Sequence, residues 1–272
     1  MSVGRGTRKA GFIASIGAVT LGFVSFFGGL ALLLRDSLAH LVRGPVSGQP
    51  VGWRAFWTQA VRAGPRALPV VFIVNLFVGM ILALIGGKIL MGLGVTEYVG
   101  DLIGVGVVLE LGPLLTGVIM TGYIGAALTA EIATMVVNEE ITALKTMSIN
   151  PVRYIVAPRL LAVMLMVPAI TLLGDYVGVF GGLLVAWEVL DLSSNTFFEH
   201  AQSSLGTRDV WRGLIKATTF GFLIGSIGCY QGFRVSGGAE GVGRVTTGAV
   251  VRTIIAIIVA DAVLNYFLLF RL

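Results

Sequence analysis

Residues 110–161 read ELGPLLTGVIMTGYIGAALTAEIATMVVNEEITALKTMSINPVRYIVAPRLL and decide the fold, because an apolar run opens there into a short charged segment and then resumes. The apolar runs on either side are long enough to cross about 30 Å of hydrocarbon, which takes roughly 20 helical residues. The stretch therefore predicts two membrane-spanning helices joined by a charged hairpin.

The composition extends this prediction to the whole chain. Of the 272 residues, 56% are hydrophobic and only 12% are charged, and the mean hydropathy is +0.93. So little polar surface cannot cover a water-soluble globule, so we predict an all-α integral membrane protein with one permease domain. The formal net charge of +5 is modest and indicates membrane orientation, with no expected binding to nucleic acid.

Cysteine and histidine are scarce. Cys229 is the only cysteine, which excludes a disulfide within the chain, and it is accompanied only by His40 and His200. These residues do not form a zinc or iron ligand pattern. We predict that the chain binds no metal and no cofactor.

Six apolar runs are long enough to be candidate spans. They cover about residues 12–34, 68–96, 102–130, 155–187, 214–233 and 248–270. If only the last five cross the membrane, eleven basic residues lie on one side and four on the other, and the positive-inside rule makes the richer side cytoplasmic. The eleven are Arg35, Arg43, Arg54, Arg62, Arg66, Lys145, Arg153, Arg159, Arg234, Arg244 and Arg252, and the four are Lys88, Arg208, Arg212 and Arg271.

The first run would place Arg5, Arg8 and Lys9 outside if it spanned. We therefore predict five transmembrane helices and an N-terminal interfacial, or monotopic, helix, with six spans as the alternative. Residues 1–66 form the interfacial helix and linker in this prediction, and residues 67–272 form the permease domain. Within the linker, the Trp and Arg residues of segment 44–66 favour either a helix at headgroup level or an ordinary cytoplasmic linker.

The charged hairpin predicts a short amphipathic helix at about residues 139–148. Asn138 is a good N-cap, Glu139 and Glu140 fall in the first turn, and apolar residues recur at 141, 144 and 147. Asn150 then caps the next helix, with Pro151 at its first position. Such a helix suits a permease that receives force from a soluble partner, and the alternative is a connecting helix resting on the membrane surface.

The same residues resemble the MlaE/YrbE family, the permease subunits of ABC-type lipid transporters that work with MCE-domain proteins. The resemblance covers about residue 65 to the end, including a second block from Cys229 to Val251. The matching motifs are Glu110 to Pro113, Gly122 to Ala126, Ala130 to Met135, Glu139 to Leu144, Pro151 with Tyr154, and Pro158 with Arg159. The departures are Tyr123 for the family's usual Arg, Ala126 for Ser, Ala133 for Gly, and changes at residues 140–142.

The resemblance implies a homodimeric lipid permease in the bacterial cytoplasmic (inner) membrane, an MCE-domain protein on its outer face and a cytoplasmic ABC ATPase. The residues implied to couple to the ATPase are Glu139, Glu140, Ile141, Leu144, Lys145 and Met147. The sequence contains no G-x-x-x-x-G-K-[ST] phosphate-binding loop, so ATP is expected on the partner and this chain is not expected to be an enzyme.

Four charged residues lie at similar depth inside the predicted spans. Glu110, Asp175, Lys216 and Asp261 fall about 12 to 18 Å below the outer boundary at roughly 1.5 Å per residue. Each is costly in hydrocarbon unless it is paired or faces water. We hypothesise that Lys216 and Asp261 meet across a cavity for a lipid (phospholipid) headgroup, with Asp175 or Glu110 nearby and Tyr123 as a further cavity residue.

Other interpretations remain open at this point. Lys216 extends to the outer surface in one alternative, and Glu110 is a structural acceptor at a bent helix in another. Glycines at 174–182 and 221–228 predict close helix packing or a dimer seam. Two other function classes are an ion-coupled secondary transporter, for which we find no internal repeat, and a membrane scaffold that anchors partner proteins.

Overall fold

The computed structural model describes residues 28–32, 35 and 53–270, and these form a bundle of long helices. Five helical paths in it are long and apolar enough to cross a membrane, which confirms the predicted five spans. They run over Trp53–Gly92, Thr96–Val137, Val152–Glu188, Thr207–Phe233 and Gly238–Leu268. The predicted interfacial helix at 12–34 lies mostly outside the described residues.

The first path joins α2 (Trp53–Ala63) to α3 (Leu68–Gly92). The second begins with the 3-10 turn η1 (Thr96–Tyr98) and contains the helices α4 (Val99–Gly106), α5 (Gly112–Met120) and α6 (Ala126–Val137). The π-helical turn η2 (Val107–Leu111) lies between α4 and α5, and the π-helical turn η3 (Thr121–Gly125) lies between α5 and α6. After α7 (Glu140–Thr146), η4 (Val152–Val156) leads into α8 (Ala157–Glu188). Then follow α9 (Ser194–Ser204), α10 (Thr207–Phe233) and α11 (Gly238–Phe270).

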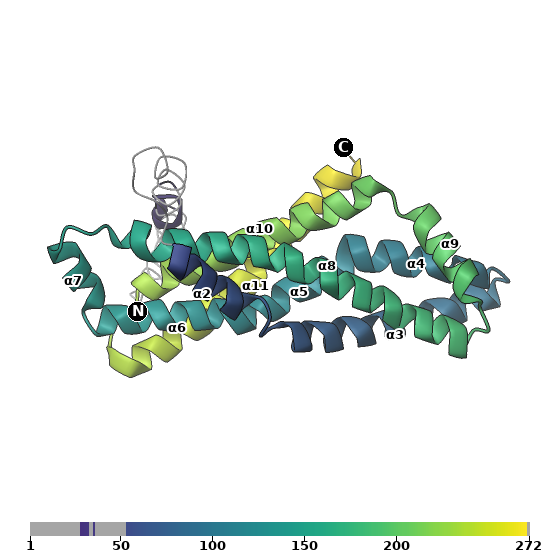
Figure 1. Ribbon diagram of the computed structural model, residues 1–272, viewed down its shortest axis with the longest axis horizontal. Helices are drawn as coiled ribbons and strands as arrows, with labels where there is room; N and C mark the ends of the chain where they lie inside the picture. Colours follow the sequence, from purple (N-terminus) through teal and green to yellow (C-terminus); the bar gives the residue numbers. More distant parts are fainter. Residues whose placement is uncertain (1–27, 33–34, 36–52, 271–272) are drawn as a thin grey trace, which may run out of the picture.

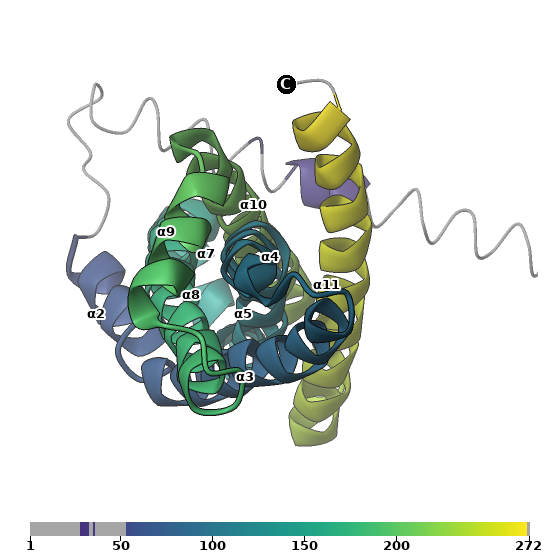
Figure 2. The ribbon, with the colours of Figure 1, turned by 90° about the vertical axis from the view of Figure 1, so that its right-hand side faces the viewer.

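Figure 1 shows α7 at one end of the bundle and α9 at the other, and we name these the α7 end and the α9 end. In the end-on view of Figure 2, α2 and α11 stand on opposite sides, with α8 and α10 between them. Helix α8 packs against α2, α3, α5 and α10, so it is the central helix of the bundle. Its partners hold it along most of its length.

Three apolar clusters follow one another from end to end. The middle cluster joins Met120, Val163, Phe220 and Ile257, which come from four different spans. The cluster at the α9 end includes Ile103, Val185 and Phe197, and the cluster at the α7 end includes Leu128, Ile132, Ile141, Ile155 and Cys229. The α7 and α9 segments are thus held to the spans by buried side chains.

The glycines predicted to allow close packing do so within one chain. A Cβ on Gly79 of α3 would overlap the carbonyl oxygen of Gly178 on α8, and one on Gly181 would overlap that of Leu76. Gly221 and Gly225 of α10 face α8 in the same manner. Small residues let the backbones approach closely, so these positions are occupied by contacts inside the bundle.

The charged hairpin differs from its prediction in detail. Helix α7 spans only Glu140–Thr146, so the helix expected over about 139–148 is shorter than predicted. Asn138 terminates α6, and Glu139 adopts a left-handed conformation (φ 61°) at the start of α7. The prediction of Asn138 as N-cap and Glu139 in the first turn is therefore wrong, because α6 continues as far as Val137 and the chain must reverse sharply within two residues.

The next corner agrees with the sequence. The Asn150 side chain accepts a hydrogen bond from the Val152 amide at 2.9 Å, as expected for a cap with Pro151 at the first helical position. The segment 53–63 forms the helix α2, and its buried residues Phe56 and Ala60 pack against Ala162 of α8. Trp53 and Trp57 flank Phe56 and remain 62% exposed.

The last two spans begin earlier than expected. Helix α10 starts at Thr207 because Asp209 accepts a hydrogen bond from the Gly206 amide and pairs with Arg212, which keeps these charged residues in the helix. Helix α11 starts at Gly238, well before the apolar run predicted to begin at about residue 248. Helix α9 was not predicted, and it begins where Ser193 accepts a hydrogen bond from the Thr196 amide.

Candidate functional site

The structure brings three of the four predicted membrane charges together. Lys216 of α10 is only 2% exposed and pairs with Glu110 of η2 at 2.5 Å and with Asp261 of α11 at 3.1 Å. The alternative in which Lys216 extends to the surface is therefore wrong. We call Glu110, Lys216, Asp261 and Asn265 the charge cluster.

The backbone of the second span contributes to this cluster because of Pro113. Proline has no backbone N–H, so it cannot donate to the carbonyl four residues earlier, which is that of Leu109. Lys216 Nζ donates to this Leu109 carbonyl oxygen at 2.9 Å. The lysine thus satisfies a backbone acceptor that the helix leaves free, and it neutralises the neighbouring Glu110.

Asn265 is a member that the sequence analysis missed. Its Nδ2 donates to both carboxylate oxygens of Glu110 at 3.0 Å each and approaches Asp261 Oδ2 at 3.3 Å. The available signal was its position four residues after Asp261, which places both on one face of α11. Because its side chain is uncharged, Asn265 does not stand out among the charged residues of the spans.

Among the three charged members of the charge cluster, Glu110 is the accessible one. The side chain of Glu110 is 37% exposed, whereas those of Lys216 and Asp261 are 2% and 9% exposed. Lys216 and Asp261 contact each other directly, so the arrangement offers a carboxylate supported by a buried ammonium and an amide. Such a group can hold a polar or cationic ligand headgroup while its own charge remains compensated.

Asp175 and Tyr123 form no hydrogen bond or ion pair with the charge cluster within residues 53–270. Asp175 of α8 is 7% exposed and packs against the backbone of Gly112, and its Oδ1 has no hydrogen-bond partner in the described part of the chain. Tyr123 is 40% exposed and lies 13 residues beyond Glu110 along the same helical path, about 20 Å away at 1.5 Å per residue. The charged residue near Lys216 and Asp261 is therefore Glu110.

At the α7 end, α7 is anchored by one side and exposed on the other. Ile141 is 6% exposed and belongs to the apolar cluster with Ile132 and Cys229, and Leu144 packs partly against it. Met147 was expected on the same face, but it is 68% exposed because the helix ends at Thr146. The exposed members of the predicted coupling set are Glu139, Glu140, Lys145 and Met147.

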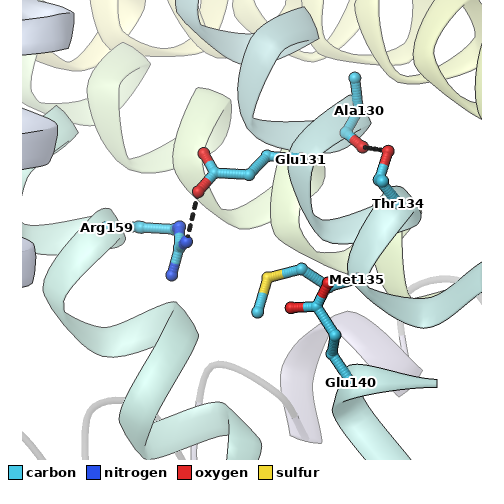
Figure 3. A pocket seen from close by; sticks show the side chains of 6 residues that line it. All are labelled: Ala130, Glu131, Thr134, Met135, Glu140 and Arg159. Carbon is cyan, nitrogen blue, oxygen red and sulfur yellow. Dashed lines mark hydrogen bonds and ion pairs between the residues drawn. The ribbon is translucent and has the colours of Figure 1, made fainter. Parts of the chain in front are cut away.

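Beside α7, Glu131 of α6 links two arginines from different helices. Its Oε1 accepts a hydrogen bond from Arg159 of α8 at 2.7 Å, and its Oε2 lies 3.4 Å from Arg62 of α2. A cavity of about 480 Å³ opens next to this group (Figure 3). It is lined by Ala130, Glu131, Thr134, Met135, Glu140 and Arg159.

Five apolar spans, a charge cluster within them and a helix presented at one end define a multi-pass membrane protein. The sequence profile of the MlaE permease family matches residues 56–267. The chain therefore belongs to the MlaE family of ABC transporter permeases. Membership of such a family implies a transport subunit that works with an ATPase.

The relatives agree with this family. A probable ABC transporter permease protein of Rickettsia typhi is 35% identical over 246 residues, which is 90% of this chain and 93% of that protein. A protein of the same description from Rickettsia prowazekii is 40% identical over 203 residues, covering 75% of this chain and 78% of the relative. The chloroplast protein TRIGALACTOSYLDIACYLGLYCEROL 1 of Arabidopsis thaliana is 33% identical over 217 residues, covering 80% of this chain and 62% of the plant protein.

Proposed function

We propose that this chain is the permease of an ABC-type transporter that moves phospholipid or a related lipid. Two copies form the membrane unit, an ATPase binds at the α7 end, and an MCE-domain protein binds at the α9 end. The name of the Arabidopsis relative refers to a galactolipid, which supports a lipid cargo. ATP is bound by the partner subunit.

The observation that carries this proposal is the construction of α7. Ile141 anchors the helix to α6, to η4 at the start of the third span and to α10, through the apolar cluster that contains Ile132, Ile155 and Cys229. Glu140 and Lys145 remain exposed for a partner. A partner that moves α7 therefore acts on three spans at once, because a close-packed interior transmits displacement.

The distribution of charge supports a cytoplasmic α7 end. Basic side chains are frequent there, and fewer lie at the α9 end, as the positive-inside rule requires. Lys145, Arg153, Arg159, Arg234 and Arg62 belong to or adjoin the segments of the α7 end, against Lys88, Arg208 and Arg212 beside the α9 end, while Lys216 is buried within its span. The protein then resides in the cytoplasmic membrane of a bacterium.

The charge cluster supports a role in cargo contact. Lys216 lies nearer the start of α10 at Thr207, which follows α9, than its end at Phe233, so the cluster is nearer the α9 end, and Glu110 is its accessible acceptor. Charged residues within spans are costly and mark substrate pathways. Lipid headgroups that carry amines or hydroxyls match the carboxylate of Glu110, so the headgroup passes this cluster during transport.

The test uses the tagged permease purified with its own partners and reconstituted in liposomes that contain a fluorescent phospholipid. We expect an ATPase to copurify and lipid movement to require ATP. The Asp261→Ala variant should insert normally but lose most lipid movement, whereas Glu188→Ala, an exposed carboxylate at the end of α8, should retain it. Lipid movement that does not require ATP, but that stops when the proton gradient is dissipated, would overturn the proposal in favour of an ion-coupled transporter.

A further inference from the structure

The cavity beside α7 has a definite chemical character. Two carboxylates line it, Glu131 from α6 and Glu140 from α7, while Ala130 and Met135 supply apolar wall. Figure 3 shows the Glu131 carboxylate turned toward Arg159, and the Thr134 hydroxyl donates to its own helix at the Ala130 carbonyl. Arg159 also lines the cavity, but its charge is paired with Glu131, so Glu140 is the lining charge that is left without an ion pair among the described residues.

The two carboxylates differ in how well they are compensated. Glu131 pairs with Arg159 at 2.7 Å and with Arg62 at 3.4 Å. Glu140 approaches only the Asn138 amide, at 3.5 Å, and forms no ion pair among residues 53–270. The mouth of the cavity thus presents an uncompensated negative charge above an apolar wall.

This combination fits a long basic side chain. Lysine and arginine carry an aliphatic stem that packs on apolar surface and a charged head that pairs with carboxylates. Methionine adapts its shape to such stems because it is unbranched and flexible. Phosphate groups and acidic side chains are disfavoured beside Glu140, because Arg159, the cation that lines the cavity, is already paired with Glu131.

We propose that this cavity, here called the acidic socket, receives an arginine or lysine side chain of the ATPase partner. The inference rests on the proposed function, since it names a specific contact at the end where the ATPase binds. The socket lies between α6, α7 and α8, so an inserted side chain touches the presented helix and two spans together. The inserted side chain would let the partner pull α7 sideways as well as push on it.

Occupation of the acidic socket has a consequence for α2. A cation placed beside Glu131 competes with Arg62, whose side chain is 49% exposed and whose contact is the longer of the two. The Arg159 pair is shorter and its arginine is only 13% exposed, so it persists. Docking would then break the ion pair that links α2 to α6, while α2 stays packed against α8 through Phe56 and Ala60.

The experiment measures the affinity of the copurified ATPase for the permease in nanodiscs at several salt concentrations. Glu140→Gln should weaken binding about five- to tenfold and flatten its salt dependence, because a partly shielded ion pair is lost. Glu240→Gln is the matched control, since this carboxylate in the first turn of α11 is exposed but does not line the socket, and it should change the affinity less than about twofold. Both residues are exposed, so neither variant should impair folding.

A photo-crosslinking amino acid in place of Met135 provides an independent readout. We expect it to attach to the ATPase beside a lysine or arginine, as identified by mass spectrometry. Equal affinities for the Glu140→Gln and Glu240→Gln variants, or a crosslink to a surface without basic residues, would overturn the proposed socket contact while leaving the proposed function intact. A wild-type permease that binds no ATPase at all would instead refute the proposed function.

Discussion

Replacing Lys216 by methionine tests the charge cluster most directly. The substitution keeps a long unbranched side chain but removes the ammonium that pairs with Glu110 and Asp261 and that donates to the Leu109 carbonyl. Two carboxylates and a buried backbone acceptor then lose their partner in a position where Lys216 is 2% exposed. Removing one partner of a buried ion pair costs about 3–5 kcal/mol.

The cost translates into a measurable shift of the unfolding temperature. For a domain of this size, each kcal/mol changes Tm by about 2–4 °C, so Lys216→Met should lower Tm by about 6–20 °C. The measurement is a thermal scan of intrinsic tryptophan fluorescence in nanodiscs. Lys88→Met is the control, because this exposed lysine at the end of α3 should leave Tm unchanged.

Two further variants check the reasoning. Asp261→Asn keeps the Lys216 to Glu110 pair and should cost less, about 1–3 kcal/mol, as expected for a weakened charged hydrogen bond. Combining it with Lys216→Met should cost less than the sum, because the double variant leaves one unpaired carboxylate where the single lysine variant leaves two. A Tm for Lys216→Met within about 2 °C of the wild type would refute the argument that the cluster is a buried, mutually dependent unit.

Two other predictions concern packing and capping. Gly79→Ala should destabilise the protein by about 1–3 kcal/mol, because the new Cβ overlaps the Gly178 carbonyl oxygen, whereas Gly122→Ala meets nothing within 4 Å and should be tolerated in the same thermal scan. Ser193→Ala should remove the N-cap of α9 at a cost of about 0.5–2 kcal/mol and speed amide hydrogen exchange in that helix, while Ser203→Ala near its other end should not. Equal effects within either pair would contradict the contacts on which these predictions rest.

Hydropathy was sufficient to predict the five spans, because a run of apolar residues has few alternatives in a membrane protein. Depth counting also worked for the charge cluster. Residues on different spans but at similar depth can meet, and Lys216, Asp261 and Glu110 do so. Depth alone does not fix the direction in which a side chain points, and for that reason Asp175 was grouped with them although it faces Gly112.

The features that the sequence did not reveal depend on tertiary contacts or on single backbone torsions. The π-helical turns η2 and η3 shift the faces of the second span, and no residue pattern marks them. The left-handed Glu139 displaced the expected cap of α7, since a non-glycine residue in this conformation is uncommon. The grouping of Arg62, Glu131 and Arg159 joins residues that are far apart in the chain, and one sequence gives no register between them.

The direct backbone contact between α3 and α8 limits how the permease can change shape. Side chains normally form a layer over which two helices can shear, but at Gly79, Gly178 and Gly181 the two main chains meet with no such layer. The two helices therefore move together as one rigid body. Opening and closing of a lipid path must come from helices that contact the α3–α8 pair through side chains. Spin labels on α3 and α8 should therefore keep a constant separation through the whole ATP cycle.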